Sequence, residues 1–200
     1  MLPVLSEKLS SYFVRSKIIR QEDKEIYSYS VEVLLATVIN FAMLYAIAFI
    51  MGRVWETTLF IAGFVPLRSL AGGYHAKNHL RCLMVLLFTY IGFLAAVYLI
   101  PHELYLPVNI GCVCVSIICV WLLSPVGDKN KPLSASEKKH FRIRSRAVIF
   151  IYAGVILAGT LLFQHRIEFL CISVGIVSVS LSLVAAYLRN KRTVTPTAGP

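Results

Sequence analysis

The chain has 200 residues, of which 58% are hydrophobic and only 15% are charged, and its mean hydropathy is +0.73. Soluble domains are about 45–50% apolar, so this composition predicts an integral membrane protein and excludes a separate soluble domain. The net charge is +10, from 20 Lys and Arg against 10 Asp and Glu. Basic residues collect on the cytoplasmic loops of membrane proteins, so the excess does not indicate a nucleic-acid partner.

Residues 1–32 are expected to form an N-terminal amphipathic segment. Basic residues lie between apolar ones that recur at helical spacing, namely Leu5, Leu9, Tyr12, Phe13 and Ile19. This pattern is typical of a helix that lies on the membrane surface, although a solvated linker is the alternative.

The fold class expected for residues 33–188 is an all-α membrane domain of six transmembrane helices. The second is the weakest, because its apolar run, 54–67, has only 14 residues and contains Pro66. Proline ends or kinks a helix, so a re-entrant segment is the alternative to a span completed by residues 69–71. The apolar runs of the six spans are expected at about 33–51, 54–67, 83–100, 104–124, 147–163 and 168–188.

Two further features complete the expected organisation. Ser134 and Glu137 fit a capping box, which predicts that the fifth helix begins in the cytoplasm before it enters lipid. Residues 189–200 are expected to be a disordered cytoplasmic tail.

The distribution of basic residues predicts the orientation. With the N-terminus in the cytoplasm, segments 1–32, 68–82, 125–146 and 189–200 are inside and hold five, three, seven and three Lys or Arg. The outside turns hold only Arg53 and Arg166. Every loop then obeys the positive-inside rule, which favours six spans with both termini cytoplasmic over the re-entrant alternative.

The first cytoplasmic loop, residues 68–82, contains a thiol and two imidazoles among basic residues. Cys82 is expected in the first turn of the third span, near Arg68, Lys77 and Arg81, which favours the thiolate. A histidine beside it could take the thiol proton and return it to a leaving amine, as in a thiol peptidase.

Spacing alone leaves that histidine undecided. On an unbroken helix His75 is seven residues from Cys82, about 10 Å along the axis, whereas His79 is three residues away. His75 can serve only if the chain bends, which Gly72 and Gly73 permit. The same His75, His79 and Cys82 also suit zinc, as in a zinc-dependent membrane protease, but no acidic general base accompanies them. Ordinary interfacial residues in a non-enzymatic transporter or receptor are a further reading.

The run from Arg68 to Cys82, with Gly72-Gly73-Tyr74-His75-Ala76 and a cysteine seven residues after the histidine, resembles the accessory gene regulator B family. These are bacterial membrane cysteine peptidases of peptide quorum sensing. The similarity extends to the chain length, the hydropathy pattern and the segment between Pro125 and Pro132. The loop motif is specific, whereas the helices match mainly in pattern.

The resemblance implies a multi-pass cysteine endopeptidase of the bacterial cell membrane that needs no cofactor and no metal. It makes Cys82 the nucleophile and His75 its base, gives supporting roles to Arg68, Gly72 and Gly73, and places Lys129 and Lys131 near the substrate. The implied substrate is a short pro-peptide with an amphipathic leader and an acidic C-terminal tail. The enzyme would remove the tail and close the signal segment into a thiolactone or lactone. A homodimer is a further expectation from the resemblance.

Overall fold

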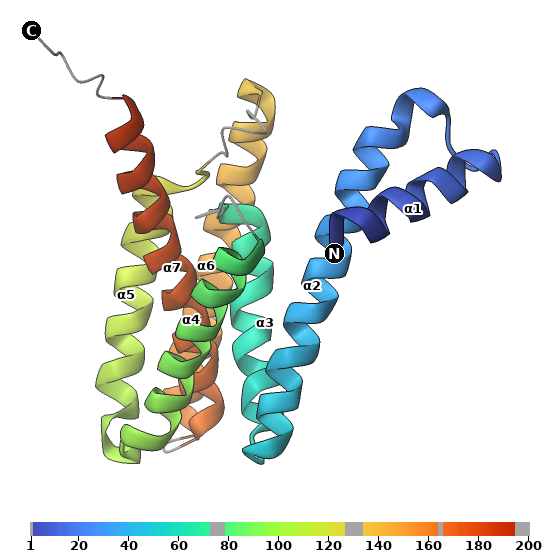
Figure 1. The fold of residues 1–200 in the computed structure, drawn as a ribbon. Coiled ribbons are helices and arrows are strands. Elements are labelled where there is room, and N and C mark those ends of the chain that lie inside the picture. Colours follow the sequence, from blue (N-terminus) through green and yellow to red (C-terminus); the bar gives the residue numbers. More distant parts are fainter. Residues whose placement is uncertain (1, 73–78, 127–133, 164–165, 195–200) are drawn as a thin grey trace, which may run out of the picture. The chain divides into compact units, whose positions relative to one another are not determined.

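The computed structural model describes residues 2–72, 79–126, 134–163 and 166–194 (Figure 1). Within these residues the chain forms seven α-helices and two short 3₁₀ helices. The described part contains no β-strand, and its extended pairing is limited to one isolated bridge between Gly72 and Val126. The predicted all-α class is confirmed.

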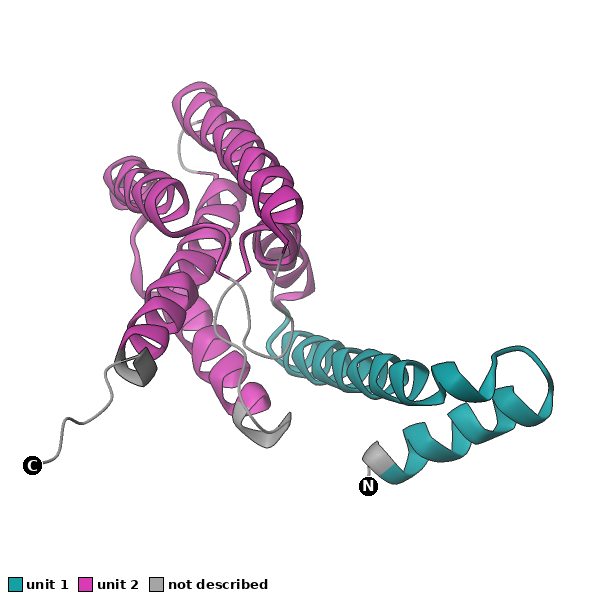
Figure 2. Cartoon of the chain, turned by 90° about the horizontal axis from the view of Figure 1, so that it is seen from above, with its two compact units in different colours: residues 1–52 teal, residues 53–200 magenta. Residues whose placement is uncertain are grey.

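The chain divides into two compact units, residues 1–52 and residues 53–200 (Figure 2). The first unit contains α1 (Leu2–Arg15), the 3₁₀ helix η1 (Gln21–Asp23) and α2 (Lys24–Ile50). Two small buried side chains of α1, Ser6 and Ser10, allow α2 to pack closely on it. A helix therefore forms where the amphipathic segment is expected, and its place on a membrane surface stays a prediction.

The second unit is a bundle of five α-helices with a short 3₁₀ helix, η2 (His102–Leu104), between the second and the third (Figure 1). Its main core joins four of them through apolar side chains such as Leu67, Val120, Ile149 and Ile176. The helices are α3 (Val54–Ala71), α4 (His79–Leu99), α5 (Tyr105–Leu123), α6 (Ala135–Leu162) and α7 (Ile167–Val194).

Five segments of the described chain are long and apolar enough to cross a membrane. They are Gln21–Ile50, Cys82–Leu99, His102–Leu123, Ala135–Leu162 and Ile167–Lys191. The chain is therefore a multi-pass membrane protein by length and composition. Helix α3 is not one of the five, so the sixth span and the orientation of the termini stay predictions.

Helices α3 and α7 approach each other closely because glycines face each other across their interface. A Cβ atom added to Gly63 would lie 2.6 Å from the carbonyl oxygen of Ile172, and one added to Gly175 would lie 2.6 Å from that of Phe60. Small residues at helix interfaces allow backbones to meet in this way inside membranes. Helix α4 packs on α3 through aromatic rings, with the centroids of Phe60 and Phe93 4.5 Å apart.

Pro66 does not end the second apolar run, because α3 continues through it to Ala71. Proline lacks the N–H group that would bond the carbonyl of Ala62 four residues earlier. The hydroxyl of Tyr152 on α6 donates to that carbonyl oxygen at 2.5 Å and satisfies it instead. The sequence did not show this compensation, since the partner comes from a distant helix.

Helix α6 begins as the sequence predicts. The Ser134 hydroxyl accepts from the Glu137 amide at 3.2 Å, and the Glu137 carboxylate accepts from the Ser134 amide at 2.9 Å. This capping box satisfies two of the amides that a helix start leaves unbonded. At the other end of the chain, α7 is longer than expected and continues past residue 188 to Val194.

Candidate active site

Cys82 lies in the first turn of α4, where the sequence places it, and its side chain is exposed. The other four cysteines lie within the apolar helices α5 and α7. All five thiols are free. An exposed thiol in the first turn of a helix is accessible to a substrate.

Among the basic side chains that the structure describes, Arg68, in the last turn of α3, interacts with this thiol. Its guanidinium is close enough to Cys82 for the two groups to interact electrostatically. The arginine stays cationic near neutral pH, because its ordinary pKa lies far above 7. The site therefore holds a positive charge that is fixed by hydrogen bonds.

Two contacts fix the position of the Arg68 guanidinium. Its Nη1 atom donates to the carbonyl oxygen of Gly72 at 3.1 Å and to the hydroxyl of Ser182 on α7. The first contact closes the end of α3, and the second ties it to the last helix of the bundle. Because α3 and α7 are held together by their glycine contacts, the charge is set on a rigid part of the fold.

Gly72 ends α3 in a backbone conformation that only glycine adopts easily, with φ of +78° and ψ of −148°. The residue pairs with Val126, whose amide donates to the carbonyl of Ala71 at 3.1 Å. This bridge joins the basic segment 68–82, at Gly72, to the basic segment 125–146, at Val126. Gly72 thus has a structural role in the described residues, and its supporting role in catalysis stays a prediction.

Gly72→Ala is expected to lower the stability of the protein markedly. A Cβ atom at this position would lie 2.3 Å from the carbonyl oxygen of Val126, so the bridge must separate. The strained conformation adds about 1–3 kcal/mol. Thermal unfolding in detergent measures the loss. Gly52→Ala is the matched control, because Gly52 also has positive φ but an added Cβ there meets no atom within 4 Å. Equal melting temperatures for the two variants would contradict the role given to the bridge.

Four of the predicted site residues lie outside the described residues: Gly73, His75, Lys129 and Lys131. His79 begins α4, so its backbone shares a helix with Cys82, three residues away, but its side chain is not described. The structure therefore does not decide which histidine is the base. The zinc alternative also stays open. Among the predicted residues, the structure brings together Arg68, Gly72 and Cys82.

Ser182 is a site residue that the sequence reasoning missed. Its hydroxyl accepts the hydrogen bond from Arg68, although the two residues are 114 positions apart in the chain. The available signal was the spacing of Ser178 and Ser182, which are four residues apart and share one face of the last apolar helix. That spacing marks a polar face but does not identify its partner, which depends on the packing of α3 against α7.

The fold and this site define a class: a small multi-pass helical membrane protein with an exposed cysteine at the start of one helix and a hydrogen-bonded arginine at the end of another. Comparison with known proteins specifies the class further. The family model for accessory gene regulator B (AgrB) matches residues 6–183, and the chain belongs to this family. Membership supports a role in the processing of quorum-sensing peptides.

Individual proteins named as AgrB-like match the chain at low sequence identity. An AgrB-like protein of Listeria monocytogenes serotype 4a is 24% identical over 157 residues, 76% of each chain. One from Listeria innocua is 25% identical over 158 residues, again 76% of each chain. One from Clostridium acetobutylicum is 29% identical over 149 residues, 72% of this chain and 67% of the relative. No solved structure matches the chain.

Proposed function

We propose that the protein is a cysteine endopeptidase of the bacterial cell membrane, which removes the C-terminal tail of a quorum-sensing pro-peptide and cyclises the signal segment. The observation that supports it most directly is the exposed Cys82 thiol in the first turn of α4, within electrostatic reach of Arg68. Family membership supports the substrate class. In this proposal Cys82 is the nucleophile, His75 is the base, and Gly73 supports the bend that brings them together.

In the first step, the Cys82 sulfur attacks the carbonyl carbon of the peptide bond before the acidic tail. The carbon–nitrogen bond breaks, His75 gives its proton to the leaving amine, and the signal segment remains on Cys82 as a thioester. Conversion of an amide into a thioester without ATP is uphill, so loss of the released tail draws the step forward. Arg68 stabilises the thiolate that starts the reaction.

In the second step, a thiol or hydroxyl of the bound peptide attacks the thioester carbonyl. Its proton passes to His75, its sulfur or oxygen becomes bonded to that carbon, the carbon–sulfur bond to Cys82 breaks so that the Cys82 thiolate leaves, and the product is a thiolactone or a lactone. Holding both ends of the peptide in one pocket makes the step intramolecular, which is worth roughly 7–11 kcal/mol. Water must be kept out, because hydrolysis of the thioester would give a linear peptide.

The basic segments 68–82 and 125–146 suit a substrate with an acidic tail and an apolar leader that lies in the membrane interface. Lys129 and Lys131, which we assign to the substrate, follow Val126 of the bridge by three and five residues. Arg146 has a structural role instead. Its guanidinium lies 3.9 Å from the centroid of the Trp121 ring and donates to the Trp121 carbonyl at 2.9 Å.

The proposal includes six spans, with α3 as the second, and both termini in the cytoplasm. This arrangement places Arg68, Cys82 and the seven-charge segment 125–146 on the same side of the membrane. The bridge between Gly72 and Val126 requires the ends of α3 and α5 to lie together, which six spans allow. In this arrangement the N-terminal α1 lies on the cytoplasmic surface. The proposal also includes a homodimer, which only the resemblance to the family supports.

Cysteine accessibility tests this topology. Single reporter cysteines at Lys77 and Lys138, introduced into a variant without native cysteines, are expected to resist a membrane-impermeant maleimide in intact cells. A reporter at His102, in the turn between α4 and α5, should react, because that turn is outside. Detergent permeabilisation should make all three react. Reaction of Lys77→Cys or Lys138→Cys in intact cells would contradict the six-span arrangement.

A further inference from the structure

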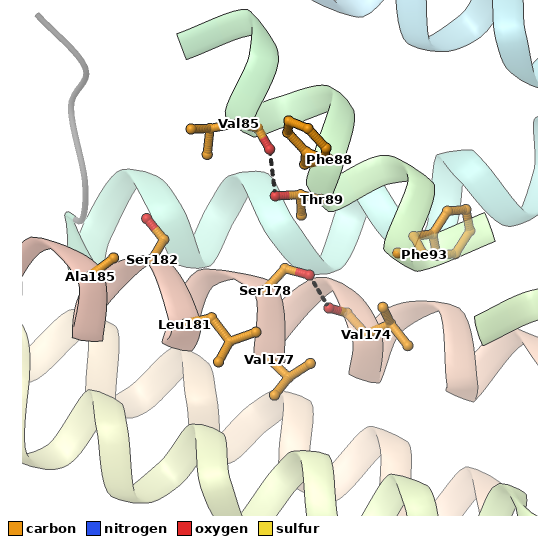
Figure 3. Close-up of a pocket in the computed structure, with 11 residues that line it drawn as sticks. Val85, Phe88, Thr89, Phe93, Val174, Val177, Ser178, Leu181, Ser182 and Ala185 are labelled. Atoms are coloured by element: carbon orange, nitrogen blue, oxygen red, sulfur yellow. Dashed lines mark hydrogen bonds between the residues drawn. The ribbon is translucent and has the colours of Figure 1, made fainter. Parts of the chain in front are cut away.

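A groove of 550 Å³ lies between α4 and α7, inside the second unit (Figure 3). Its volume is within the range of about 300–1,000 Å³ that small-ligand pockets occupy. Figure 3 shows Val85, Phe88 and Thr89 on α4 across the groove from residues on α7 that include Leu181 and Ser182. The surface is therefore continuous along two facing helices.

The groove is lined mainly by apolar side chains. Most of its side chains are aliphatic or aromatic, and the hydroxyls of Thr89 and Ser178 donate to carbonyls of their own helices at 2.8 and 2.7 Å. A ligand therefore meets mainly hydrocarbon along the groove. Gly92 widens it, since a Cβ atom added there would meet nothing within 4 Å.

The groove continues the face of α4 that contains the proposed nucleophile. Val85 and Thr89 line the groove and follow Cys82 by three and seven residues, so all three share one helical face. A peptide whose scissile bond lies at the Cys82 sulfur would therefore extend directly into this space. The groove is a continuation of the candidate active site, and none of the residues assigned to that site from the sequence belongs to it.

The charge at the Cys82 end orients such a peptide. Ser182 lines the groove and also holds the guanidinium of Arg68, so a fixed positive charge stands where the apolar lining ends. Acidic residues are favoured at the charged end, and apolar residues are favoured along the groove. The two chemistries match a peptide that changes from apolar to acidic at the cleaved bond.

We infer that the α4–α7 groove binds the apolar residues that precede the scissile bond of the substrate, with the acidic residues that follow it directed toward Arg68. This inference rests on the proposed function, because it assigns the two sides of the bond that Cys82 attacks. The groove also shields the thioester from water, since a bound apolar segment fills the space beside it.

Binding to an inactive protein tests the groove separately from catalysis. The full chain with Cys82→Ala is placed in lipid nanodiscs and titrated with a fluorescein-labelled synthetic peptide that has five Leu and Phe residues followed by an acidic tail. A second peptide has the Leu and Phe residues replaced by Ser. Gly92→Leu fills the groove from α4, and Gly154→Leu is the matched control, because Gly154 on α6 also has open space around an added Cβ.

The apolar peptide is expected to bind at least about tenfold more weakly to Gly92→Leu than to the parent or to Gly154→Leu. The Ser peptide should bind weakly to all three proteins. Leu181→Trp fills the groove from α7 and should reproduce the effect, since the Leu181 side chain is exposed and a larger ring there does not disturb the core. An unchanged melting temperature of each variant in nanodiscs shows that the fold is retained.

Equal binding of the apolar peptide to all variants would overturn the inference. The occupant of the groove would then be lipid or a second copy of the chain. Equal binding of the two peptides to the parent would overturn it as well. Failure of the proposed function gives a different result: the Cys82→Ala protein would still release the acidic tail of a pro-peptide. The two failures are therefore distinguishable.

Discussion

Replacement of Cys82 by alanine is expected to abolish release of the acidic tail, with a loss of about 10⁴-fold or more. No other group in the proposed site can form the acyl-enzyme, and removal of a nucleophile from a catalytic unit typically eliminates most of its rate enhancement. Mass spectrometry of a co-expressed pro-peptide measures tail release. Mass spectrometry of the intact protein also detects the thioester, which should be absent from the variant.

Cys114→Ala is the matched control, because Cys114 is also a free and exposed cysteine but lies within α5. This variant should process the peptide like the parent protein, and iodoacetamide should inactivate both. Strong chelators should leave both active. Normal processing by Cys82→Ala would favour a transporter or receptor, and loss of activity to a chelator with recovery on addition of zinc would make His75, His79 and Cys82 a ligand set.

The apolar periodicity and the charge pattern were sufficient to predict where most helices lie. The turn between α4 and α5, the capping box of α6 and the position of Cys82 in the first turn of a helix are all local features, set by residues within a few positions of each other. Such features depend on short-range chemistry, which a sequence displays directly.

Features that depend on packing between distant helices were not predictable from the sequence. Pro66 suggested the end of a helix, but Tyr152 supplies the missing hydrogen bond from α6. Ser182 resembled one of several small polar residues in an apolar run, yet it positions Arg68. The reason for glycine at position 72 became clear only when Val126 was found beside it. In each case the partner lies more than 50 residues away in the chain.

His75→Ala is expected to abolish both tail release and formation of the acyl-enzyme, whereas His79→Ala should retain substantial turnover. General acid–base catalysis typically contributes about 10²–10⁴-fold, so the two variants should be easy to distinguish. In the described residues α3 ends at Ala71 and α4 begins at His79, so His79 shares a helix with Cys82. His75 lies outside the described residues, and the two variants therefore have to decide between the histidines.

The pH dependence of acylation separates a base from a residue that only supports the fold. If His75 is the base, the rate of acylation should rise with pH as the imidazole loses its proton, and this inflection should disappear in His75→Ala. His79→Ala should keep the inflection, because its effect would be limited to the start of α4. An inactive His79→Ala variant beside an active His75→Ala variant would show that His79, the nearer histidine on the helix, is the base.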